Sequence, residues 1–367
     1  MICVTENIST QGKCEMKNDI ISILSPSLNH EKYMKFFIDS VLAQTNPNWE
    51  LIIVDDGSTD NNIAEIKKYE DPRIKLIQQP FNMGLNCALM TAFENSCGKY
   101  VAFCATDDAL MPNFVQSVTD FMDSNPDVGV LYTGLQCMDT ENNIIPDRTI
   151  VADTGNRYEI LKKLFYSENI MTSPGQVVRS SEFARIQPLN VAMSQNQDCK
   201  IHVDLLLHTN CHTLPDKLIM YRVPSVKSGL SYRTPLSKRR CELEERRVMD
   251  AYLQISDVDT LKNIFQDDLK PFGKIDKKLI PYVLGMLAMN SKNEYKKIWG
   301  HTQVSDFIDT IDNYQLVNKK YGFCYRDFLN LAGKFDTNPF EIKYLKYKNL
   351  FNKSLILALL LGLLAIL

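Results

Sequence analysis

Two adjacent carboxylates, Asp107 and Asp108, lie just past the apolar run of residues 100–104, after Ala105 and Thr106. Neighbouring carboxylates repel each other unless a cation lies close to them. One or two carboxylates, completed by water and phosphate oxygens, form a ligand set that suits Mg²⁺ or Mn²⁺. An ion held in this way would neutralise a diphosphate leaving group. Either aspartate could instead cap a helix that begins near Pro112, so the pair alone leaves both interpretations open.

A second acidic segment, residues 55–60, follows the apolar run 51–54. A carboxylate at the end of a strand can accept a hydrogen bond from a base or a ribose, as in dinucleotide-binding folds. Asp55 and Asp56 could equally form a turn, with Asp60 capping the next helix. The chain has no G-x-G-x-x-G after its first apolar run and no G-x-x-x-x-G-K-[ST], which disfavours a Rossmann dehydrogenase and a P-loop NTPase.

The elements that must position these carboxylates alternate in type between residue 18 and about residue 135. Strands are expected at 20–24, 51–54, 74–78, 100–104 and 128–132, and helices at 31–44, 63–69, 84–95 and 112–124. This alternation predicts an α/β fold with right-handed crossovers, a mainly parallel sheet and helices on both faces. Ligands of such sheets bind beyond the carboxyl ends of the strands, so the loops after residues 24, 54 and 104 are expected to form the site.

The regular alternation weakens after residue 132. A hairpin turn is expected at 142–143, helices at 158–166 and 198–208, and strands at 175–179 and 218–223. From residue 236 the chain is expected to be helical and highly charged, with cations and anions mixed on a solvated helix face. We therefore expect a domain boundary near residue 235.

Composition excludes several classes of protein. The 41 basic and 44 acidic residues nearly cancel, which argues against a dedicated nucleic-acid binder. The ten cysteines are scattered without a C-x-x-C pair, which argues against a disulfide framework or a structural zinc site and favours a reducing, cytoplasmic compartment. Residues 1–18 lack the features of a signal peptide and are expected to form a poorly ordered leader.

Five segments together resemble the family 2 inverting glycosyltransferases, which bind nucleotide sugars with the Rossmann-like GT-A fold. The segments are ISILSPSLN (21–29), SVLAQTNPNWELIIVDDGSTD (40–60), NMGLNCA (82–88), GKYVAFCATDD (98–108) and MPNF (111–114). Their order and spacing suit the family over about residues 19–225. The resemblance implies a GT-A domain at 19–235, followed by a C-terminal helical region at 236–353.

The resemblance also implies roles for individual residues in donor binding. Ser25 and Pro26, at the end of the first strand, and Asp56 are expected to line the base and the ribose. Gly84, in the N-x-G segment, is expected to contact the nucleotide sugar. The bound cofactor would be Mn²⁺ or Mg²⁺.

The acidic pair matches the D-x-D-like motif of the family. Asp107 is expected near the donor ribose and the metal, and Asp108 is the expected direct metal ligand. Two features depart from many relatives: Leu89 and Met90 stand where an Arg-Asn pair is common, and Pro224 follows a Tyr-Arg-Val strand where a histidine is often available to the metal.

The catalytic base of the family lies in a later acidic motif at the start of a helix. Gln197-Asp198 matches best, which makes Asp198 the expected base, although it could instead be an N-cap. Asp204 is the second candidate, but the helical pattern places it on the solvent side. In an inverting displacement, one carboxylate deprotonates the acceptor hydroxyl while the diphosphate leaves from the opposite face.

The implied activity is metal-dependent transfer of one hexosyl or N-acetylhexosaminyl group from a nucleotide-diphosphate sugar to a glycan or glycolipid, as in the biosynthesis of surface polysaccharide or lipooligosaccharide. The chain has no Q-x-x-R-W motif, which favours nonprocessive transfer. Two alternatives stay open. The acceptor could be polyprenyl phosphate, which needs no base, or the chain could be a non-catalytic scaffold subunit that binds nucleotide sugars.

The C-terminal segment suggests a membrane contact. Residues 355–367 are entirely apolar but too short to span a bilayer comfortably, and residues 340–353 carry four lysines among aromatic side chains. Such a segment is typical of an anchor that lies in the interface of an anionic membrane. We therefore expect an apolar tail at 354–367 and a peripheral position on the inner face of the plasma membrane. The alternative is a buried C-terminal helix.

Overall fold

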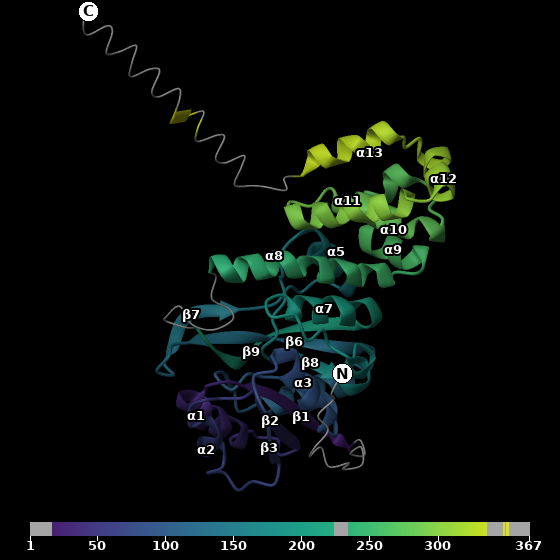
Figure 1. Cartoon of the computed structure of the whole chain (residues 1–367). Helices are drawn as coiled ribbons and strands as arrows, with labels where there is room; N and C mark the ends of the chain where they lie inside the picture. Colours follow the sequence, from purple (N-terminus) through teal and green to yellow (C-terminus); the bar gives the residue numbers. More distant parts are fainter. Residues whose placement is uncertain (1–16, 224–233, 336–347, 349, 352–367) are drawn as a thin grey trace, which may run out of the picture. The chain divides into compact units, whose positions relative to one another are not determined.

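A computed structural model describes residues 17–223, 234–335, 348 and 350–351 of the chain (Figure 1). The chain divides into two compact units between Pro271 and Phe272. The expected apolar tail at 354–367, most of the basic segment 340–353, and residues 1–16 of the expected leader lie outside the described residues. Among the described helices, none is both long and apolar enough to cross a membrane.

The first unit contains one nine-stranded sheet and most of the helices. Its strands are β1 (Lys17–Ser27), β2 (Trp49–Asp55), β3 (Ile74–Gln78), β4 (Gly98–Phe103), β5 (Ala109–Leu110), β6 (Val128–Met138), β7 (Ile144–Ile150), β8 (Val177–Arg179) and β9 (Asn210–Arg222). Its α-helices are α1 (Glu31–Leu42), α2 (Asn62–Ile66), α3 (Leu85–Glu94), α4 (Phe114–Ser124), α5 (Arg157–Tyr166), α6 (Ser180–Arg185), α7 (Gln197–His208), α8 (Pro235–Asp250) and α9 (Val258–Phe265).

The strand order is β3-β2-β1-β4-β8-β6-β9-β5, with β7 paired to β6. The four longest ladders are parallel and join β3 to β2, β2 to β1, β1 to β4, and β6 to β9. The antiparallel ladders that involve β5, β7 and β8 are short. The predicted α/β fold with a mainly parallel sheet is thereby confirmed.

Helices cover both faces of the sheet, which explains why the strands read as continuous apolar runs. On one face, Phe37 of α1 and Phe114 of α4 join Ile23 and Ile53 in the main hydrophobic core. On the other face, Phe183 of α6 packs edge-to-face against Phe93 of α3 and Phe103 of β4, with ring centroids 4.9 and 5.1 Å apart.

The helical part that begins at residue 235 starts inside the first unit. The 3-10 helix η1 (Ala251–Gln254) and helix α9 follow α8 and pack on the sheet domain. Phe165 of α5 contacts Tyr252 and Phe265 with ring centroids 4.9 and 4.8 Å apart. The compact first unit therefore runs past the boundary expected at residue 235, because these aromatic contacts hold η1 and α9 against α5.

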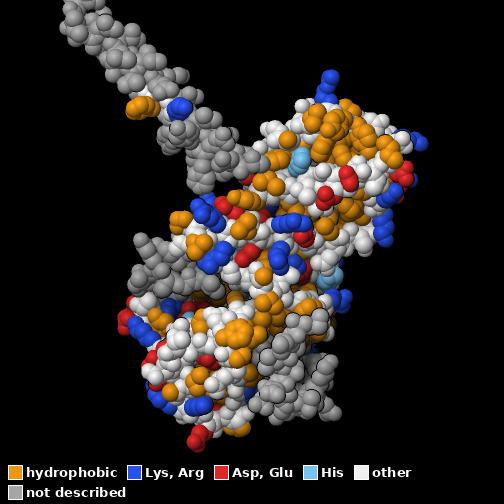
Figure 2. All heavy atoms as spheres, viewed as in Figure 1, with side chains coloured by type: hydrophobic (Ala, Val, Ile, Leu, Met, Phe, Trp, Pro, Cys, Tyr) orange, Lys and Arg blue, Asp and Glu red, His pale blue; other side chains and the backbone are white. Residues whose placement is uncertain are grey.

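Cationic and anionic side chains are mixed along α8, as the sequence predicts, and both kinds are exposed on the surface in Figure 2. Lys238 lies 4.0 Å from Glu242, and Arg246 lies 3.8 Å from Asp250, both at i,i+4 spacing. Exposed ion pairs of this kind add little stability. Their presence agrees with the expected solvent-exposed face of α8.

The second unit is helical. Its 3-10 helix η2 (Gln266–Phe272) crosses the division, and η3 (Lys277–Leu279), α10 (Ile280–Ala288), α11 (Glu294–Ile308), α12 (Ile311–Tyr321), α13 (Tyr325–Leu331) and η4 (Ala332–Lys334) follow. Helices α10 and α11 approach closely at Gly285 and Gly300. A Cβ at Gly300 would lie 2.6 Å from the carbonyl oxygen of Gly285, so this packing requires glycine.

Most of the described cysteines are free thiols, and three of these, Cys104, Cys137 and Cys199, are buried. Seven are free, namely Cys87, Cys104, Cys137, Cys199, Cys211, Cys241 and Cys324. Cys97, however, is disulfide-bonded, which the scattered spacing of the cysteines did not predict.

Candidate active site

The loops after β1, β2 and β4 meet at one edge of the sheet. In the parallel ladders Ser27 pairs with Asp55, and Leu24 pairs with Phe103, so the three strands end side by side. The acidic segments 55–60 and 105–108 therefore follow neighbouring strand ends, as the sequence predicts.

A continuous chain of polar side chains crosses this edge. The Asn62 amide donates to Asp55 Oδ1 (2.6 Å) and to Ser27 Oγ (2.9 Å), and Thr106 Oγ1 donates to Ser27 Oγ (2.8 Å). His30 Nδ1 lies 2.8 Å from Thr106 Oγ1. If Thr106 donates to Ser27 and the Nδ1 of a neutral His30 donates to Thr106 Oγ1, then Nε2 is left as an acceptor.

His30 brings an imidazole to the acidic pair. Its Nε2 lies 4.0 Å from Asp107 Oδ2, and both side chains are partly exposed. Sequence reasoning missed His30 because it looked for a metal-binding histidine directly after the Tyr-Arg-Val strand, where Pro224 stands. The local signal was its place in the loop after the first strand, where ligands of parallel sheets bind.

Asp108 is buried at the end of the loop between β4 and β5 (residues 104–108), which is called the acidic loop below. Its Oδ1 accepts a hydrogen bond from the backbone N–H of Arg222 at 2.8 Å. Burial, and then the charge of Asp107, raise the pKa of the Asp108 carboxyl well above its usual value. Asp107 is more exposed, with 37% of its side chain accessible.

The acidic pair fits a divalent cation in its donor chemistry. The two carboxylates are adjacent in sequence, and the pKa of buried Asp108 is raised, so a cation beside them would stabilise the ionised form of Asp108. In the part of the chain that the structure describes, no three His, Cys, Asp or Glu side chains form a complete metal site. An ion here would therefore take Asp107, Asp108 and oxygens from the diphosphate or water, which is usual for Mg²⁺.

Arg222 locks the acidic loop in place. Its guanidinium donates to the backbone oxygens of Asp107 (2.7 Å) and Asp139 (2.6 Å) and to Asn142 Oδ1 (2.6 Å). It also stacks over the Tyr33 ring at 4.1 Å. Sequence reasoning treated residues 218–223 only as a strand, so this contribution was missed.

Replacing Arg222 by lysine should lower the free energy of unfolding by roughly 2–4 kcal/mol, because a lysine ammonium cannot serve three acceptors in one plane and stack on Tyr33. Urea unfolding of both proteins would measure the difference. Arg239→Lys on the exposed face of α8 is the matched control and should change stability by less than about 0.5 kcal/mol. Equal effects at the two positions would contradict the locking role.

The structure brings Asp56 and Gly84 together, two residues expected to bind the donor. Asp56 Oδ1 and Oδ2 accept hydrogen bonds from the backbone N–H groups of Met83 (2.6 Å) and Gly84 (2.9 Å). Gly84 has φ +92°, a left-handed conformation that favours glycine. Burial raises the pKa of Asp56, and the carboxylate holds the loop before α3.

Ser25 and Pro26 lie within β1, opposite Ile53 and Val54 of β2. Ser25 is fully buried, and Pro26 is half-buried. The side chain that β1 contributes to the polar chain at the edge is Ser27, one residue beyond the expected pair. Contact of Ser25 and Pro26 with a nucleotide stays a prediction.

Asp198 lies in the first turn of α7, and the N-cap position belongs to Asn196. Its Oδ2 accepts a hydrogen bond from the Asn169 amide at 3.1 Å, and its Oδ1 accepts one from the backbone N–H of Cys199 at 2.7 Å. Burial raises the pKa of Asp198, as suits a group that must take up a proton. Within the described residues, its hydrogen bonds do not extend to Asp107 or Asp108.

Residues 22–186 match the sequence model of Glycosyl transferase family 2. This part of the chain is a family 2 glycosyltransferase domain. The match begins in β1 and ends after α6, so it includes the sheet edge with both acidic segments.

Curated relatives of the glycosyltransferase domain come from bacteria and archaea. An uncharacterized glycosyltransferase of Methanocaldococcus jannaschii is 25% identical over 59% of this chain and 75% of its own length. The UDP-Glc:alpha-D-GlcNAc-diphosphoundecaprenol beta-1,3-glucosyltransferase WfgD of Escherichia coli is 31% identical over 40% of this chain and 57% of its own length. The putative teichuronic acid biosynthesis glycosyltransferase TuaG of Bacillus subtilis is 37% identical over 28% and 42%.

Solved structures share the fold beyond the glycosyltransferase domain. Residues 1–349 of S. aureus TarS, in complex with UDP-GlcNAc, superpose with a TM-score of 0.53 over 83% of this chain and 93% of that one. The sequence identity is 17%, so the likeness concerns the fold alone. It supports the GT-A architecture followed by a helical region.

The second candidate for the base, Asp204, was expected on the solvent side of its helix, and this expectation is wrong. Asp204 is only 8% exposed. It forms an ion pair with Lys200 and accepts a hydrogen bond from the Gln254 amide at 3.0 Å. The reason is that η1 lies over this side of α7, which helical periodicity alone did not reveal.

Glu244 of α8 binds the backbone of the segment that leads into α7. Its Oε1 accepts from the backbone N–H of Ser194 (2.8 Å), and its Oε2 accepts from those of Gln195 (2.9 Å) and Asn196 (2.8 Å). Glu244 is 8% exposed. Because Asp198 follows two residues later, this carboxylate sets the position of the predicted base. The sequence suggested only a solvated helix here.

Proposed function

We propose that the protein is a metal-dependent inverting glycosyltransferase that moves one hexosyl or N-acetylhexosaminyl group from a nucleotide-diphosphate sugar to a cell-surface glycan or its lipid-linked precursor. The observation that carries the proposal is the acidic pair Asp107–Asp108 at the carboxyl edge of a family 2 domain. Buried Asp108, with its raised pKa, is suited to bind Mn²⁺ or Mg²⁺.

In the proposed reaction Asp198 accepts the proton of the acceptor hydroxyl as that oxygen attacks the anomeric carbon. A cation on Asp107 and Asp108 would neutralise the departing diphosphate. Asp56 and Gly84 keep the loop before α3 in place for the donor, and Arg222 keeps the acidic loop fixed. The single displacement inverts the anomeric configuration.

The proposed donor is a UDP-sugar and the proposed acceptor is lipid-linked. The name of the Escherichia coli relative gives UDP-Glc as donor and a diphosphoundecaprenol-linked sugar as acceptor, and TarS is described in complex with UDP-GlcNAc. A cytoplasmic position on the inner face of the membrane would suit such an acceptor. The basic and apolar composition of residues 340–367 supports this peripheral contact.

Mn²⁺ is expected to increase the stabilisation of the protein by UDP, and Asp108→Asn should abolish this increase. A ligand present at 100 times its Kd stabilises the folded state by about 2.7 kcal/mol. Asparagine keeps the acceptor for the Arg222 N–H, so the variant should fold. Thermal unfolding with UDP, with and without Mn²⁺, would measure both effects.

Asp120→Asn, on the exposed face of α4, is the matched control for this experiment and should respond to UDP and Mn²⁺ like the native protein. An Asp108→Asn variant with the full Mn²⁺-dependent shift would contradict the metal site. A native protein that no nucleotide stabilises would overturn the proposed function itself.

A further inference from the structure

Helix α8 presents to the solvent a face that the proposed reaction does not use. The residues of this outer face recur at helical spacing, at i, i+4, i+7 and i+11, and they are Leu236, Arg240, Leu243 and Arg247. Three of the four are exposed, and Arg240 is half-buried. The buried residues of the helix lie on the opposite side, and they are Ser237, Glu244, Val248 and Met249.

Two leucines make the outer face of α8 partly apolar. Leu243 is 76% exposed and Leu236 is 61% exposed. Among the large apolar side chains that the structure describes, none is more exposed than Leu243. A single exposed leucine is common on protein surfaces, but two that share one helix face with arginines are typical of a surface that a partner covers.

The arginines of the outer face carry positive charge that α8 does not neutralise. Arg240, Arg247 and Arg239, which lies at the edge of the same face, form no ion pair with a carboxylate in the described part of the chain. The acidic residues Glu244 and Glu245 instead contact the segment 194–196 on the inner side of the helix. The outer face therefore attracts anions.

The combination of arginine and leucine favours an anionic lipid bilayer as the partner. Guanidinium groups pair well with phosphates, and each cation near an anionic leaflet strengthens the attraction. Leucine side chains of an interfacial helix enter the boundary between head groups and acyl chains. A soluble polyanion would pair with the arginines but would leave both leucines in water, so it matches only half of the surface.

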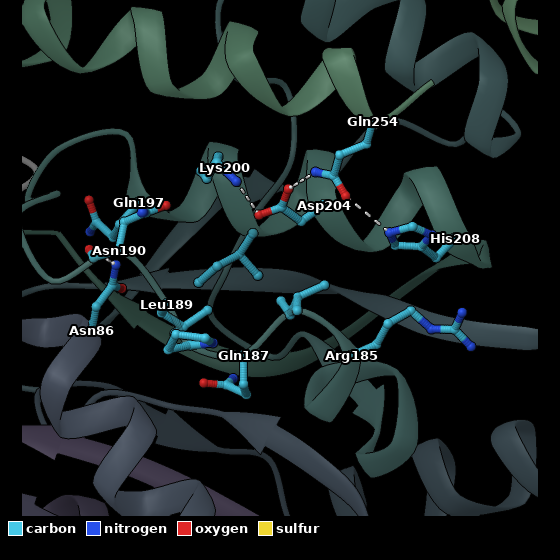
Figure 3. A pocket seen from close by; sticks show the side chains of 13 residues that line it. Asn86, Arg185, Gln187, Leu189, Asn190, Gln197, Lys200, Asp204, His208 and Gln254 are labelled. Carbon is cyan, nitrogen blue, oxygen red and sulfur yellow. Dashed lines mark hydrogen bonds and ion pairs between the residues drawn. The ribbon is translucent and has the colours of Figure 1, made fainter. Parts of the chain in front are cut away.

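The inner side of α8 connects this surface to the helix that carries the predicted base. Glu244 binds the backbone of residues 194–196, directly before α7. At its other end α8 continues into η1, where Gln254 donates to Asp204 of α7, which is paired with Lys200 (Figure 3). Helix α8 is thus joined to α7 at two points, and a surface that binds α8 also orients α7.

We propose that the outer face of α8 docks on the anionic leaflet of a membrane, with Leu236 and Leu243 in the interfacial region and Arg239, Arg240 and Arg247 on lipid phosphates. This contact is separate from the one proposed for residues 340–367. Its role in presenting a lipid-linked acceptor to the predicted base rests on the proposed function, whereas membrane binding rests on the surface of α8 alone.

Sedimentation of the full chain with lipid vesicles tests the role of the charge. Vesicles of phosphatidylglycerol and phosphatidylcholine are expected to bind the native protein, and vesicles of phosphatidylcholine alone should bind it much more weakly. Arg239→Gln/Arg247→Gln should weaken binding to the anionic vesicles about tenfold or more. Lys67→Gln/Lys217→Gln removes the same charge at exposed positions of α2 and β9, and this control should bind like the native protein.

Tryptophan fluorescence tests contact at α8 itself, whatever the C-terminal segment contributes to binding. The two native tryptophans, Trp49 and Trp299, are buried, so Leu243→Trp adds an exposed indole that reports its own surroundings. Anionic vesicles should shift this added emission to shorter wavelength, and lipids brominated in their acyl chains should quench it. Glu70→Trp, at an exposed position after α2, is the control and should show neither effect.

Three results would overturn the inference: the native protein binds no anionic vesicle, the arginine variant binds as tightly as its lysine control, or the added emission of Leu243→Trp stays unchanged while vesicles bind. Arginine-dependent binding of free polyphosphate without vesicle binding would likewise identify a soluble polyanion as the partner.

The UDP–Mn²⁺ stabilisation, measured on the same preparations, separates the two proposals and should be native in the arginine variant. If UDP binds and the tests at α8 are negative, only the docking surface is wrong. If no nucleotide binds while α8 contacts the vesicles, the proposed function is wrong and the membrane surface stands without its role in presenting an acceptor.

Discussion

Replacing Asp198 by asparagine should lower kcat by roughly 10²–10⁴-fold, because the acceptor hydroxyl then loses its general base. The Kd for UDP in the presence of Mn²⁺ should not change, since Asp198 belongs to α7 and not to the acidic loop. Asparagine keeps an oxygen that can accept from Asn169, so the local fold should persist. Steady-state kinetics together with UDP titration would measure both quantities.

The pH dependence of kcat/KM offers a second test of the same role. A general base acts only when deprotonated, so the rate falls as pH falls through its pKa. Burial raises the pKa of Asp198 above its ordinary value of 3.8. The acid limb of the pH profile, the range in which kcat/KM falls with falling pH, therefore moves to higher pH. The hydrogen bond from Asn169 lowers the same pKa, so Asn169→Leu should move the limb further up.

Full activity in Asp198→Asn would contradict the assignment. It would favour an acceptor that is already ionised, such as polyprenyl phosphate, for which no base is required. Asp127→Asn, at an exposed position before β6, serves as a control for the general effect of removing a carboxylate and should leave kcat unchanged.

Replacing Glu244 by glutamine should reduce the free energy of unfolding by roughly 2–4 kcal/mol and also lower kcat. Glu244 accepts from three backbone N–H groups, at Ser194, Gln195 and Asn196. The glutamine amide has one acceptor oxygen, and its NH₂ group would face N–H donors. At least one buried donor would lose its partner, and the segment before Asp198 would shift.

The matched control is Glu70→Gln, an exposed carboxylate after α2, which should change stability by less than about 0.5 kcal/mol. Urea unfolding gives the stability, and kinetics at saturating donor give kcat. A merely structural role would lower stability but leave kcat of the folded fraction unchanged, with the acid limb of the pH profile in its native place. That combination of results would contradict the positioning role.

The parallel sheet and its acidic edge were predictable from the sequence for a physical reason. Strands such as β2 are buried on both faces and read as uninterrupted apolar runs, and parallel pairing aligns their carboxyl ends. Asp55 ends β2 and Asp56 follows it, and Asp107 and Asp108 lie in the short loop after β4. Their place at one edge therefore follows from local pattern and parallel pairing alone.

The face that α7 presents to the solvent could not be read from periodicity. Eight of its residues are buried, including Asp204, because the sheet covers one side and η1 covers another. A helix covered on several sides has no clear polar stripe. The sequence accordingly placed Asp204 in solvent, whereas the structure buries it beside Lys200 and Gln254.

By itself, the sequence determined the order of the elements, the strand-end carboxylates and the helix that begins beside Asp198. Only the tertiary structure showed which side chains, distant in sequence, form hydrogen bonds with the strand-end loops and with the start of that helix. His30 meets Thr106 across 76 positions of sequence, and Arg222 meets Asp107 across 115. Glu244 likewise reaches Asn196 from another helix. Hydrophobic periodicity records which face of an element is buried, but a polar contact across the fold leaves no periodic signal, because it depends on how complete elements pack together.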